Sequence, residues 1–294
     1  LILGCLVDSP YEVKLIGDQS LSQRDFSRVL EPLKKFGISF KSKRGLPLKI
    51  RGTKSPKSIK YYENKSSAQV KTCIMLAAIK AEGETEIIAK KSRNHSEILF
   101  KELNIPINVK NKNERDIIKV KKTKKFSSFN YKLPGDISSA SFFIVLTLLS
   151  DKSKLLIKNV NINPTRTGII KILNLMGAKI KFRNKRTLKG EAIANIEIKS
   201  TKNFKKISLP MRFNSSAIDE FLLIFLVAAK ADGVSFFKGL SELNKKESPR
   251  LKWASKILNY MGVKNITTYD SIKIYGNPEF KLNRGSASPA NADY

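Results

Sequence analysis

The stretch LPGDISSASFFIVL, residues 133–146, sets the pattern from which the fold can be inferred. Pro-Gly ends a strand, Asp136 can cap the first turn of a helix, and an apolar run follows the small hydroxyl residues. The same order, small polar residues before an apolar helix, recurs at 65–76 and at 214–225. Because the spacing is roughly 75 residues, it indicates a repeated supersecondary unit rather than a short solenoid repeat.

Each repeat is expected to run strand, helix, strand, helix, strand, strand. In the repeat around the first helix start, these elements are expected at 58–62, 67–81, 84–89, 94–103, 105–109 and 117–120. In the next repeat they are expected at 131–133, 138–149, 154–160, 167–176, 178–182 and 195–199. In the following one they are expected at 206–209, 217–231, 234–237, 250–261, 263–267 and 271–275. The strands alternate apolar and charged residues, as in sheets with one solvated face.

The two ends of the chain fit incomplete repeats. Residues 1–52 match a repeat without its first strand and most of its first helix, with a strand at 11–16, a helix at 26–36 and strands at 38–40 and 46–50. Glu279–Leu282 resembles the opening of another repeat. We therefore expect an internal fragment of a longer protein, truncated at both ends.

The first helix of each repeat is apolar on nearly every face, which predicts burial all round. Buried helices walled by amphipathic sheets predict an α/β (α+β) fold of two prism-like domains built from these repeats. We expect the first domain at 1–133, with its N-terminal part missing, and the second at 134–294, with its C-terminal part missing.

The composition restricts the possible partners. The net charge is +31, but Lys far outnumbers Arg and no block concentrates the charge. Arg is the residue favoured for bidentate phosphate recognition, so we favour a Lys-rich surface over a nucleic-acid footprint. Cys5 and Cys73 both lie in apolar runs and are expected to be reduced core residues. No run approaches the roughly 18 apolar residues that span a bilayer.

Several polar side chains stand where anions would bind. The N-terminus of a buried helix presents free amides and a partial positive charge, and Ser67, Gln69, Ser139 and Ser216 are placed at such ends. Each serine taken alone is more simply a helix cap.

Arginines recur where the second strand of a repeat is joined to the second helix, at positions 24, 93 and 250. A lone arginine in such a loop is usually solvated, but recurrence at one place in the repeat favours a role. Asp219 lies in the first turn of an apolar helix. It is equally compatible with a cap-region acid and with a general base at the mouth of an anion pocket.

The motifs together resemble the 5-enolpyruvylshikimate-3-phosphate (EPSP) synthase family, in the family's order and over essentially the whole chain. The motifs are SQR at 22–24, RVLEPL at 28–33, LPLKIRG at 46–52, SAQVK at 67–71, AEGET at 81–85, SRNHSE at 92–97, PGD at 134–136, SSA at 138–140, DE at 219–220 and KESPRL at 246–251. The resemblance implies two prism-like domains made of six such repeats. It also implies transfer of the enolpyruvyl group of phosphoenolpyruvate to the 5-hydroxyl of shikimate 3-phosphate with release of phosphate, a step of the shikimate pathway to chorismate and the aromatic amino acids.

The resemblance also implies roles for individual residues. Shikimate 3-phosphate would be held by Ser67, Ala68, Gln69, Arg93, Asp219 and Lys246. Phosphoenolpyruvate would be held by Arg24, Gln69 and Arg250. Asp219 would accept the proton of the attacked hydroxyl and Glu247 would transfer a proton at the methylene carbon. No metal or cofactor is implied, and we expect a cytoplasmic monomer that binds small anions, not nucleic acid or membrane.

Two positions depart from the family's pattern. Asp25 stands where the family usually has Pro, and Pro249 stands where an Asp is common, so the geometry of both loops is in question. The family's N-terminal Lys-Ser…Arg segment, its Asn-Ala-Gly-Thr loop, its Asp-His-Arg motif and a late Lys are absent from these 294 residues. We therefore expect the chain by itself to be inactive.

Two other functions remain open at this point. UDP-N-acetylglucosamine enolpyruvyl transferase has the same architecture, but it carries a Cys in the loop that corresponds to 17–24, which has none here. A basic nucleic-acid-binding protein of related fold would bind RNA or DNA in a salt-sensitive manner.

Overall fold

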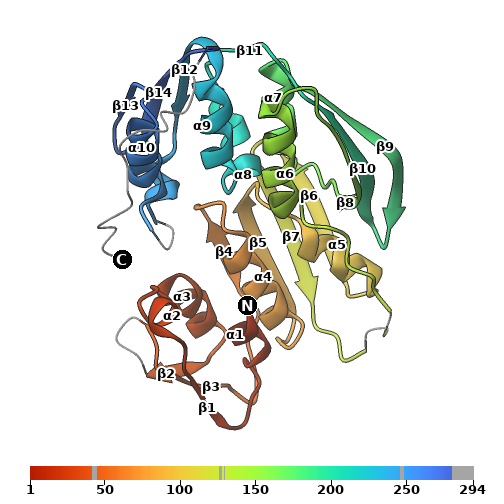
Figure 1. Ribbon diagram of the computed structural model, residues 1–294. Helices are drawn as coiled ribbons and strands as arrows, with labels where there is room; N and C mark the ends of the chain where they lie inside the picture. Colours follow the sequence, from red (N-terminus) through yellow and green to blue (C-terminus); the bar gives the residue numbers. More distant parts are fainter. Residues whose placement is uncertain (42–44, 126–127, 129, 246–247, 280–294) are drawn as a thin grey trace. The chain divides into compact units, whose positions relative to one another are not determined.

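The chain folds into two compact units, Leu1–Lys132 and Leu133–Tyr294, called unit 1 and unit 2 below (Figure 1). The structure is a computed structural model that describes residues 1–41, 45–125, 128, 130–245 and 248–279. Both units mix helices with sheets, and each contains two repeats of one pattern of elements. The expected α/β class is therefore confirmed.

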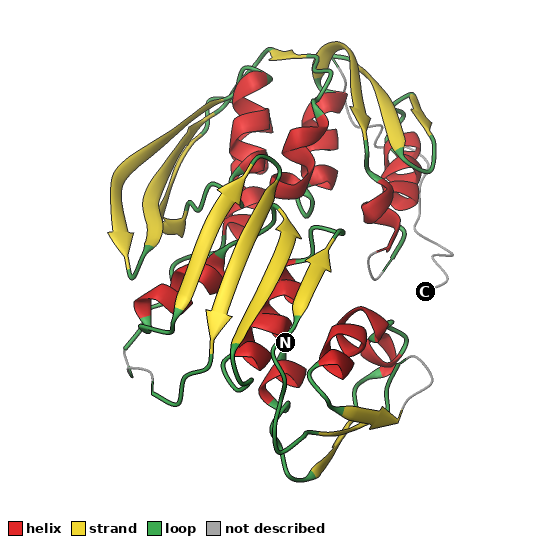
Figure 2. Cartoon of the chain, turned by 180° about the vertical axis from the view of Figure 1, so that it is seen from behind, coloured by secondary structure: helices red, strands yellow, loops and turns green. Residues whose placement is uncertain are grey.

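The most complete repeat lies in unit 1 and follows the expected order. Its elements are β4 (Lys60–Glu63), α4 (Ala68–Ala78), β5 (Glu84–Lys90), α5 (His95–Glu102), β6 (Ile107–Lys112) and β7 (Arg115–Lys121). The strands lie in the order β4-β5-β7-β6, with β4 parallel to β5 and the other neighbours antiparallel. The helices of this repeat lie on one face of the sheet (Figure 2), where Ile87, Ala89, Ile118 and Val120 are buried.

The other repeat of unit 1 is shorter. It contains α1 (Ile2–Cys5), β1 (Glu12–Leu15), α2 (Gln19–Ser22), α3 (Ser27–Lys35), β2 (Ser39–Lys41) and β3 (Leu48–Arg51), with the strand order β1-β3-β2. Its core residues join those of α4 in one cluster. A Cβ added at Gly4 would lie 2.2 Å from the carbonyl oxygen of Cys73, so α1 and α4 cross at the distance that only glycine allows.

Unit 2 repeats the same arrangement twice. The first of its repeats contains α6 (Ile137–Leu149), β8 (Lys154–Asn161), α7 (Gly168–Leu175), β9 (Lys179–Leu188) and β10 (Glu191–Lys199). The second contains β11 (Phe204–Lys205), η1 (Met211–Phe213), α8 (Asn214–Ala217), α9 (Phe221–Ala229), β12 (Ala231–Lys238), η2 (Ser241–Lys245), α10 (Arg250–Tyr260), β13 (Asn265–Thr267) and β14 (Ser271–Gly276). The strand orders are β8-β10-β9 and β11-β12-β14-β13. In both sheets the last strand of the repeat lies between the second and the third, and in the second sheet the first strand, β11, lies beside the second, β12.

Two expected strands are wrong in position. Residues 131–133 form no strand, and pairing begins only at Gly135, which makes a single parallel bridge to Val160. Pro134 has no backbone N–H and restricts the residue before it, so it cannot continue a ladder. The strand expected at 206–209 is β11, which ends at Lys205, and a lone bridge from Ser208 to Phe236 follows it.

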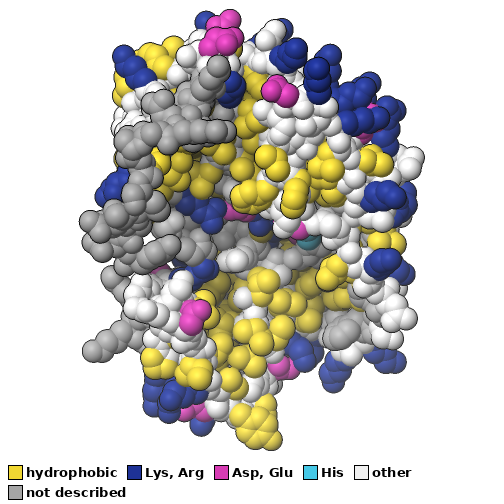
Figure 3. All heavy atoms as spheres, in the orientation of Figure 1, with side chains coloured by type: hydrophobic (Ala, Val, Ile, Leu, Met, Phe, Trp, Pro, Cys, Tyr) yellow, Lys and Arg dark blue, Asp and Glu magenta, His cyan; other side chains and the backbone are white. Residues whose placement is uncertain are grey.

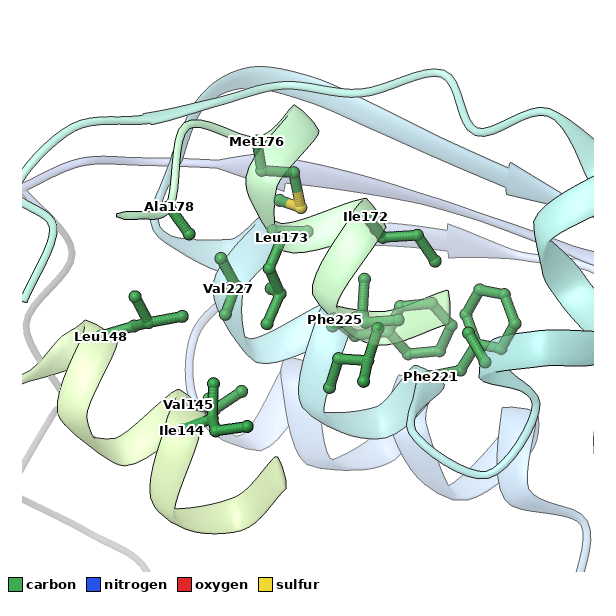
Figure 4. Packing of buried hydrophobic residues seen from close by; sticks show 14 of the residues in the cluster. Ile144, Val145, Leu148, Ile172, Leu173, Met176, Ala178, Phe221, Phe225 and Val227 are labelled. Atoms are coloured by element: carbon green, nitrogen blue, oxygen red, sulfur yellow. The ribbon is translucent and has the colours of Figure 1, made fainter. Parts of the chain in front are cut away.

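Helices α6, α7 and α9 form the core of unit 2 (Figure 4). The ring centroid of Phe225 lies 5.7 Å from that of Phe221 and 5.1 Å from that of Phe237. Such aromatic pairs contribute roughly 0.5–1.5 kcal/mol each beyond the burial of their area. These contacts tie the helix that follows Asp219 to the sheet behind it.

The expectation that every first helix is buried all round is wrong for α6. Phe142, Phe143 and Leu146 are 64%, 61% and 62% exposed. Most of the buried positions recur at a helical spacing along one stripe, at 137, 140, 141, 144, 145 and 148, and Thr147 at its side is buried too. The helix is therefore apolar on all its faces, but only one of these faces packs against the core.

The expectation that both cysteines are core residues is wrong for Cys5. Cys73 is buried in α4, whereas Cys5 is exposed. Leu3 and Gly4 are the buried residues of α1, and Cys5 at the end of this short helix lies outside the buried face. Burial raises the pKa of the Cys73 thiol to about 11.

The high positive charge is spread over the surface. Lys and Arg side chains are scattered over the visible face of each unit rather than gathered in one place (Figure 3). Within the part of the chain that the structure describes, no helix is both long and apolar enough to cross a membrane.

Candidate functional site

The turn from β4 to α4 builds the first part of the candidate site, in unit 1. Ser66 takes the left-handed conformation, with φ of 54°, and this turns the chain into the helix. Ser67 is the N-cap, and its side chain accepts a hydrogen bond from the Val70 N–H at 3.4 Å. Ala68 begins the helix and Gln69 is exposed in its first turn. The free amides of this turn and the exposed amide side chain suit an anionic ligand.

Arg93 lies at the same edge of the sheet as this helix start. It follows β5, which runs parallel to β4, and loops that follow parallel neighbouring strands meet at one edge. A direct bond confirms that the two segments meet, because the Lys71 Nζ of α4 donates to the Arg93 carbonyl oxygen at 2.9 Å. Ser67, Ala68, Gln69 and Arg93, predicted from sequence to share a ligand, therefore come from two segments that the structure joins.

Lys71 and Glu97 are residues of this region that the sequence reasoning missed. Their side chains are buried, and the Lys71 Nζ lies 2.5 Å from the Glu97 Oε1. A signal was present in the sequence, since Lys71 is the one charged residue in the apolar segment AQVKTCIMLAA at 68–78. A lone charge in such a segment has to find a buried partner.

Arg24 belongs to the other repeat of unit 1, between α2 and α3. It is exposed, and its backbone N–H donates to the Leu21 carbonyl at 3.2 Å. Asp25 beside it accepts a hydrogen bond from the Ser27 N–H at 2.8 Å, at the start of α3. The aspartate thus gives this helix start a hydrogen-bond acceptor, which the proline usual in the family would not provide.

Asp219 lies in unit 2, in a turn and not in the first turn of a long helix as expected. The segment expected as one helix at 217–231 divides into α8 and α9, and residues 218–220 form a turn between them. The Asp219 Oδ1 lies 3.4 Å from the Arg250 Nη1, and both side chains are about one quarter exposed, at 25% and 27%. The Asp219 carboxyl and the Arg250 guanidinium thus form a partly exposed pair in this turn.

Arg250 is held by the start of α10. Pro249 is the N-cap residue, and its carbonyl accepts the Trp253 N–H at 3.1 Å. Proline lacks the N–H that would be unsatisfied at a helix start, so it fits this position. Lys246 and Glu247, predicted to bind shikimate 3-phosphate and to transfer a proton, lie outside the described residues.

The sequence reasoning also missed Arg166, which lies just ahead of α7, as Arg24 and Arg93 lie ahead of α3 and α5 and Arg250 begins α10. Its Nη2 lies 3.1 Å from the Asp136 Oδ1 and donates to the Ser138 hydroxyl at 2.6 Å. The Ser138 hydroxyl in turn donates to Glu220, a buried carboxylate next to Asp219. This chain of contacts connects the start of α6 with the turn that carries Asp219.

The carboxyl of Asp136 caps α6, accepting the Ser139 N–H at 2.9 Å. Burial by itself would raise the pKa of this carboxyl, but the Ser139 N–H and the Arg166 guanidinium outweigh burial and hold the pKa below its usual value. The signal for Arg166 in the sequence was its place in the repeat.

Known proteins share these motifs and this arrangement of elements. A family model described as EPSP synthase (3-phosphoshikimate 1-carboxyvinyltransferase) matches residues 1–288. The chain belongs to the EPSP synthase family. This confirms the family inferred from the motifs.

Individual members of the EPSP synthase family match most of the chain. The 3-phosphoshikimate 1-carboxyvinyltransferase of Ruthia magnifica is 40% identical over 278 residues, which cover 94% of this chain and 63% of that relative. A solved structure of EPSP synthase from Acinetobacter baumannii has 36% identity and a TM-score of 0.81, and the match covers 94% of this chain and 62% of that one.

A more distant likeness concerns the fold alone. The structure of the enolpyruvyl transferase NikO from Streptomyces tendae has a TM-score of 0.67 at 12% identity, and the match covers 94% of this chain and 62% of that one. The chain thus spans a little under two thirds of the length of the EPSP synthases that it matches.

Proposed function

We propose that this chain carries a large part of the site of an enzyme that transfers the enolpyruvyl (carboxyvinyl) group of phosphoenolpyruvate to the 5-hydroxyl of shikimate 3-phosphate. Phosphate is released. The observation that carries the proposal is the 3.4 Å contact of Asp219 with Arg250 in a member of the EPSP synthase family. It places a candidate proton acceptor beside a guanidinium suited to carboxylate or phosphate.

Shikimate 3-phosphate is assigned to the start of α4. Ser67, Gln69 and Arg93 supply hydroxyl, amide and guanidinium donors there, and the Ala68 backbone belongs to the same turn. Helix amides favour an anion, and a guanidinium can bind phosphate through two parallel hydrogen bonds. Lys246 of unit 2 completes the set by family resemblance.

Phosphoenolpyruvate is assigned to Arg24, Arg250 and Gln69, because its phosphate and carboxylate both suit planar guanidinium groups. In the reaction, the 5-hydroxyl oxygen attacks the carbon that bears the phosphate, and Asp219 accepts the hydroxyl proton. The methylene carbon gains a proton, which we assign to Glu247. The tetrahedral adduct then expels phosphate and loses a proton from the new methyl group, which restores the double bond.

We further propose that units 1 and 2 correspond to the two domains of the fold. Unit 1 would supply most of the shikimate 3-phosphate ligands and Arg24, and unit 2 would supply Asp219, Arg250 and the segment 246–247. The protein is proposed to be a cytoplasmic monomer that needs no cofactor and binds no nucleic acid.

Calorimetric titration of the chain with three ligands tests the proposal. Shikimate 3-phosphate should bind saturably, whereas UDP-N-acetylglucosamine and an oligonucleotide at physiological salt should not. Arg93→Ala should weaken shikimate 3-phosphate binding by about tenfold or more, because a charged hydrogen bond contributes roughly 1.5–3 kcal/mol. Arg183→Ala is the matched control, since Arg183 pairs with Glu197 at 2.7 Å on a sheet surface of unit 2.

Three results would contradict the proposal. The first is binding of UDP-N-acetylglucosamine in preference to shikimate 3-phosphate. The second is oligonucleotide binding that is micromolar or tighter and falls steeply with salt, as expected of a nucleic-acid-binding protein. The third is an equal loss of affinity for shikimate 3-phosphate in Arg93→Ala and Arg183→Ala. That result would show that the affinity depends on the overall positive charge and not on the position of Arg93.

A further inference from the structure

Lys71 of α4 and Glu97 of α5 form an ion pair inside unit 1. Their side chains are 0% and 5% exposed, and the Nζ and Oε1 atoms are 2.5 Å apart. Removing two charges from water is costly, and apolar residues of the same size often stabilise a fold as well or better. Stability is therefore a weak explanation for the pair, and its geometry points to another.

The Lys71 ammonium has a second partner. It donates to the Arg93 carbonyl oxygen at 2.9 Å, and Arg93 lies just ahead of α5, outside the helical hydrogen bonds. The Lys71 ammonium thus contacts both the Glu97 carboxylate and the Arg93 carbonyl oxygen. The backbone from which the Arg93 side chain extends is thus attached to α4 by a charged donor.

The same helical turn carries the anion-binding end of α4. The Lys71 backbone N–H donates to the Ser67 carbonyl at 3.1 Å, so the cap residue and the anchor of Arg93 are one turn apart. A helical turn is rigid, so the Lys71 backbone keeps its distance from the cap, and the buried Lys71 side chain ties the Arg93 backbone to this turn. Misplacement of a binding group by about 1 Å can cost much of its effect.

We propose that Lys71, oriented by Glu97, is a positioning residue that places Arg93 for a phosphorylated, hydroxylated ring compound bound at the start of α4. The proposal rests on the proposed function, which assigns shikimate 3-phosphate to Arg93. Lys71 acts through the Arg93 backbone and does not touch the ligand.

Two variants and a matched control test this role. Lys71→Met keeps the length and apolar stem of the side chain and removes its donors. Because that change leaves Glu97 buried without its partner, the double variant K71M/E97Q removes both charges together. Thr72→Val is the control, since the Thr72 and Ser96 hydroxyls, 2.5 Å apart, form a second tie between the same two segments.

The first readout needs no ligand. Hydrogen–deuterium exchange of the peptide spanning 91–96 should speed up at least about tenfold in K71M/E97Q relative to Thr72→Val, because the Arg93 segment loses its anchor. Equal exchange of this peptide in the two variants would overturn the proposal.

The second readout is a double-mutant cycle on the affinity for shikimate 3-phosphate. K71M/E97Q should weaken binding by about tenfold in the wild-type background and by less than about twofold in the Arg93→Ala background, because the two changes act through one group. A tenfold loss of affinity caused by K71M/E97Q in both the wild-type and the Arg93→Ala backgrounds would overturn the proposal. If Arg93→Ala binds like the wild type, the assignment of the ligand to Arg93 fails instead, and the exchange of 91–96 still decides whether Lys71 positions that segment.

Discussion

Replacing Gly168 with alanine should displace the segment that carries Asp219. Gly168 is the first residue of α7, and a Cβ built there would lie 2.4 Å from the Ser216 Oγ, 2.6 Å from the Ser216 carbonyl carbon and 2.7 Å from its carbonyl oxygen. Two of these three atoms are backbone, so no side-chain rotation relieves the clash. Either α7 or α8 has to move.

The sign of the change in the free energy of unfolding distinguishes overpacking from helix propensity. In an open helix, alanine in place of glycine would stabilise by up to about 1 kcal/mol. Overpacking of a well-filled site costs typically about 1–3 kcal/mol, so Gly168→Ala should lower the free energy of unfolding of unit 2. With a urea m-value of roughly 2–3 kcal/mol/M, the midpoint should fall by roughly 0.5–1 M.

Urea unfolding followed by tryptophan fluorescence is the assay, because the single tryptophan, Trp253, lies on α10 of unit 2. Gly135→Ala is the matched control in the same unit, since a Cβ there would have its nearest neighbours at 3.6 Å, in ordinary contact. The control should change the midpoint by less than about 0.25 M. A midpoint for Gly168→Ala equal to or above that of the wild type would refute the reasoning.

Three other perturbations follow from single contacts. In the native protein a thiol reagent at pH 8 should label exposed Cys5 within minutes and Cys73 only on unfolding, because burial raises the pKa of Cys73 to about 11; prompt labelling of both would contradict the packing of α4. Asp136→Asn should lower the free energy of unfolding of unit 2 near neutral pH, and the difference from the wild type should vanish as the pH falls below roughly 3–4. The reason is that a carboxyl with a depressed pKa stabilises the fold above its unfolded pKa, and this contribution is lost on acidification. A difference in unfolding free energy that stays constant with pH in urea titrations would count against it. Ser67→Ala should cost roughly 0.5–2 kcal/mol through loss of the α4 cap and should weaken shikimate 3-phosphate binding, whereas Ser139→Ala, whose backbone N–H still reaches Asp136, should leave that affinity unchanged.

The repeats could be predicted from sequence because their ends carry local signals. Gly37, Gly177 and Gly262 follow α3, α7 and α10, and their φ values are 100°, 95° and 80°. After α7, the Ala178 N–H donates to the Leu173 carbonyl at 2.9 Å, and after α10 the Val263 N–H donates to the Leu258 carbonyl at 2.8 Å. These are the contacts of a glycine-closed helix end, and such an end depends on a few consecutive residues.

Features that depend on distant residues could not be predicted in the same way. The Lys71–Glu97 pair joins two helices and requires knowledge of which faces meet. The exposed face of α6 has the same composition as its buried face, so periodicity cannot separate them. The division of residues 217–231 is also not predictable from propensity, because no glycine or proline marks the turn at 218–220.

Of the candidate site, sequence could supply the residue types and their place in the repeat but not their partners. The recurrence of arginine before the second helix pointed to Arg24, Arg93 and Arg250, and it applied equally to Arg166. Only the structure shows that Arg166 is bound to Asp136 and Ser138. Recurrence therefore identifies a place in the repeat near the start of the first helix, but it does not identify which group the arginine contacts there.

Three repeats show this rule with different chemistry. At the start of α6, the Asp136 carboxyl accepts a hydrogen bond from the Ser139 N–H and pairs with the Arg166 guanidinium. That arginine therefore stabilises the fold. In the turn before α9, Asp219 meets Arg250 at 3.4 Å with both side chains partly exposed, so a ligand can reach the pair. On α4, the Lys71 ammonium donates a hydrogen bond to the Arg93 carbonyl oxygen, and the first turn of this helix contains no acidic residue. The arginine at this place in the repeat is thus bound to a helix-capping acid and mostly buried at Arg166, whereas Arg250 and the acid that it contacts are both partly exposed.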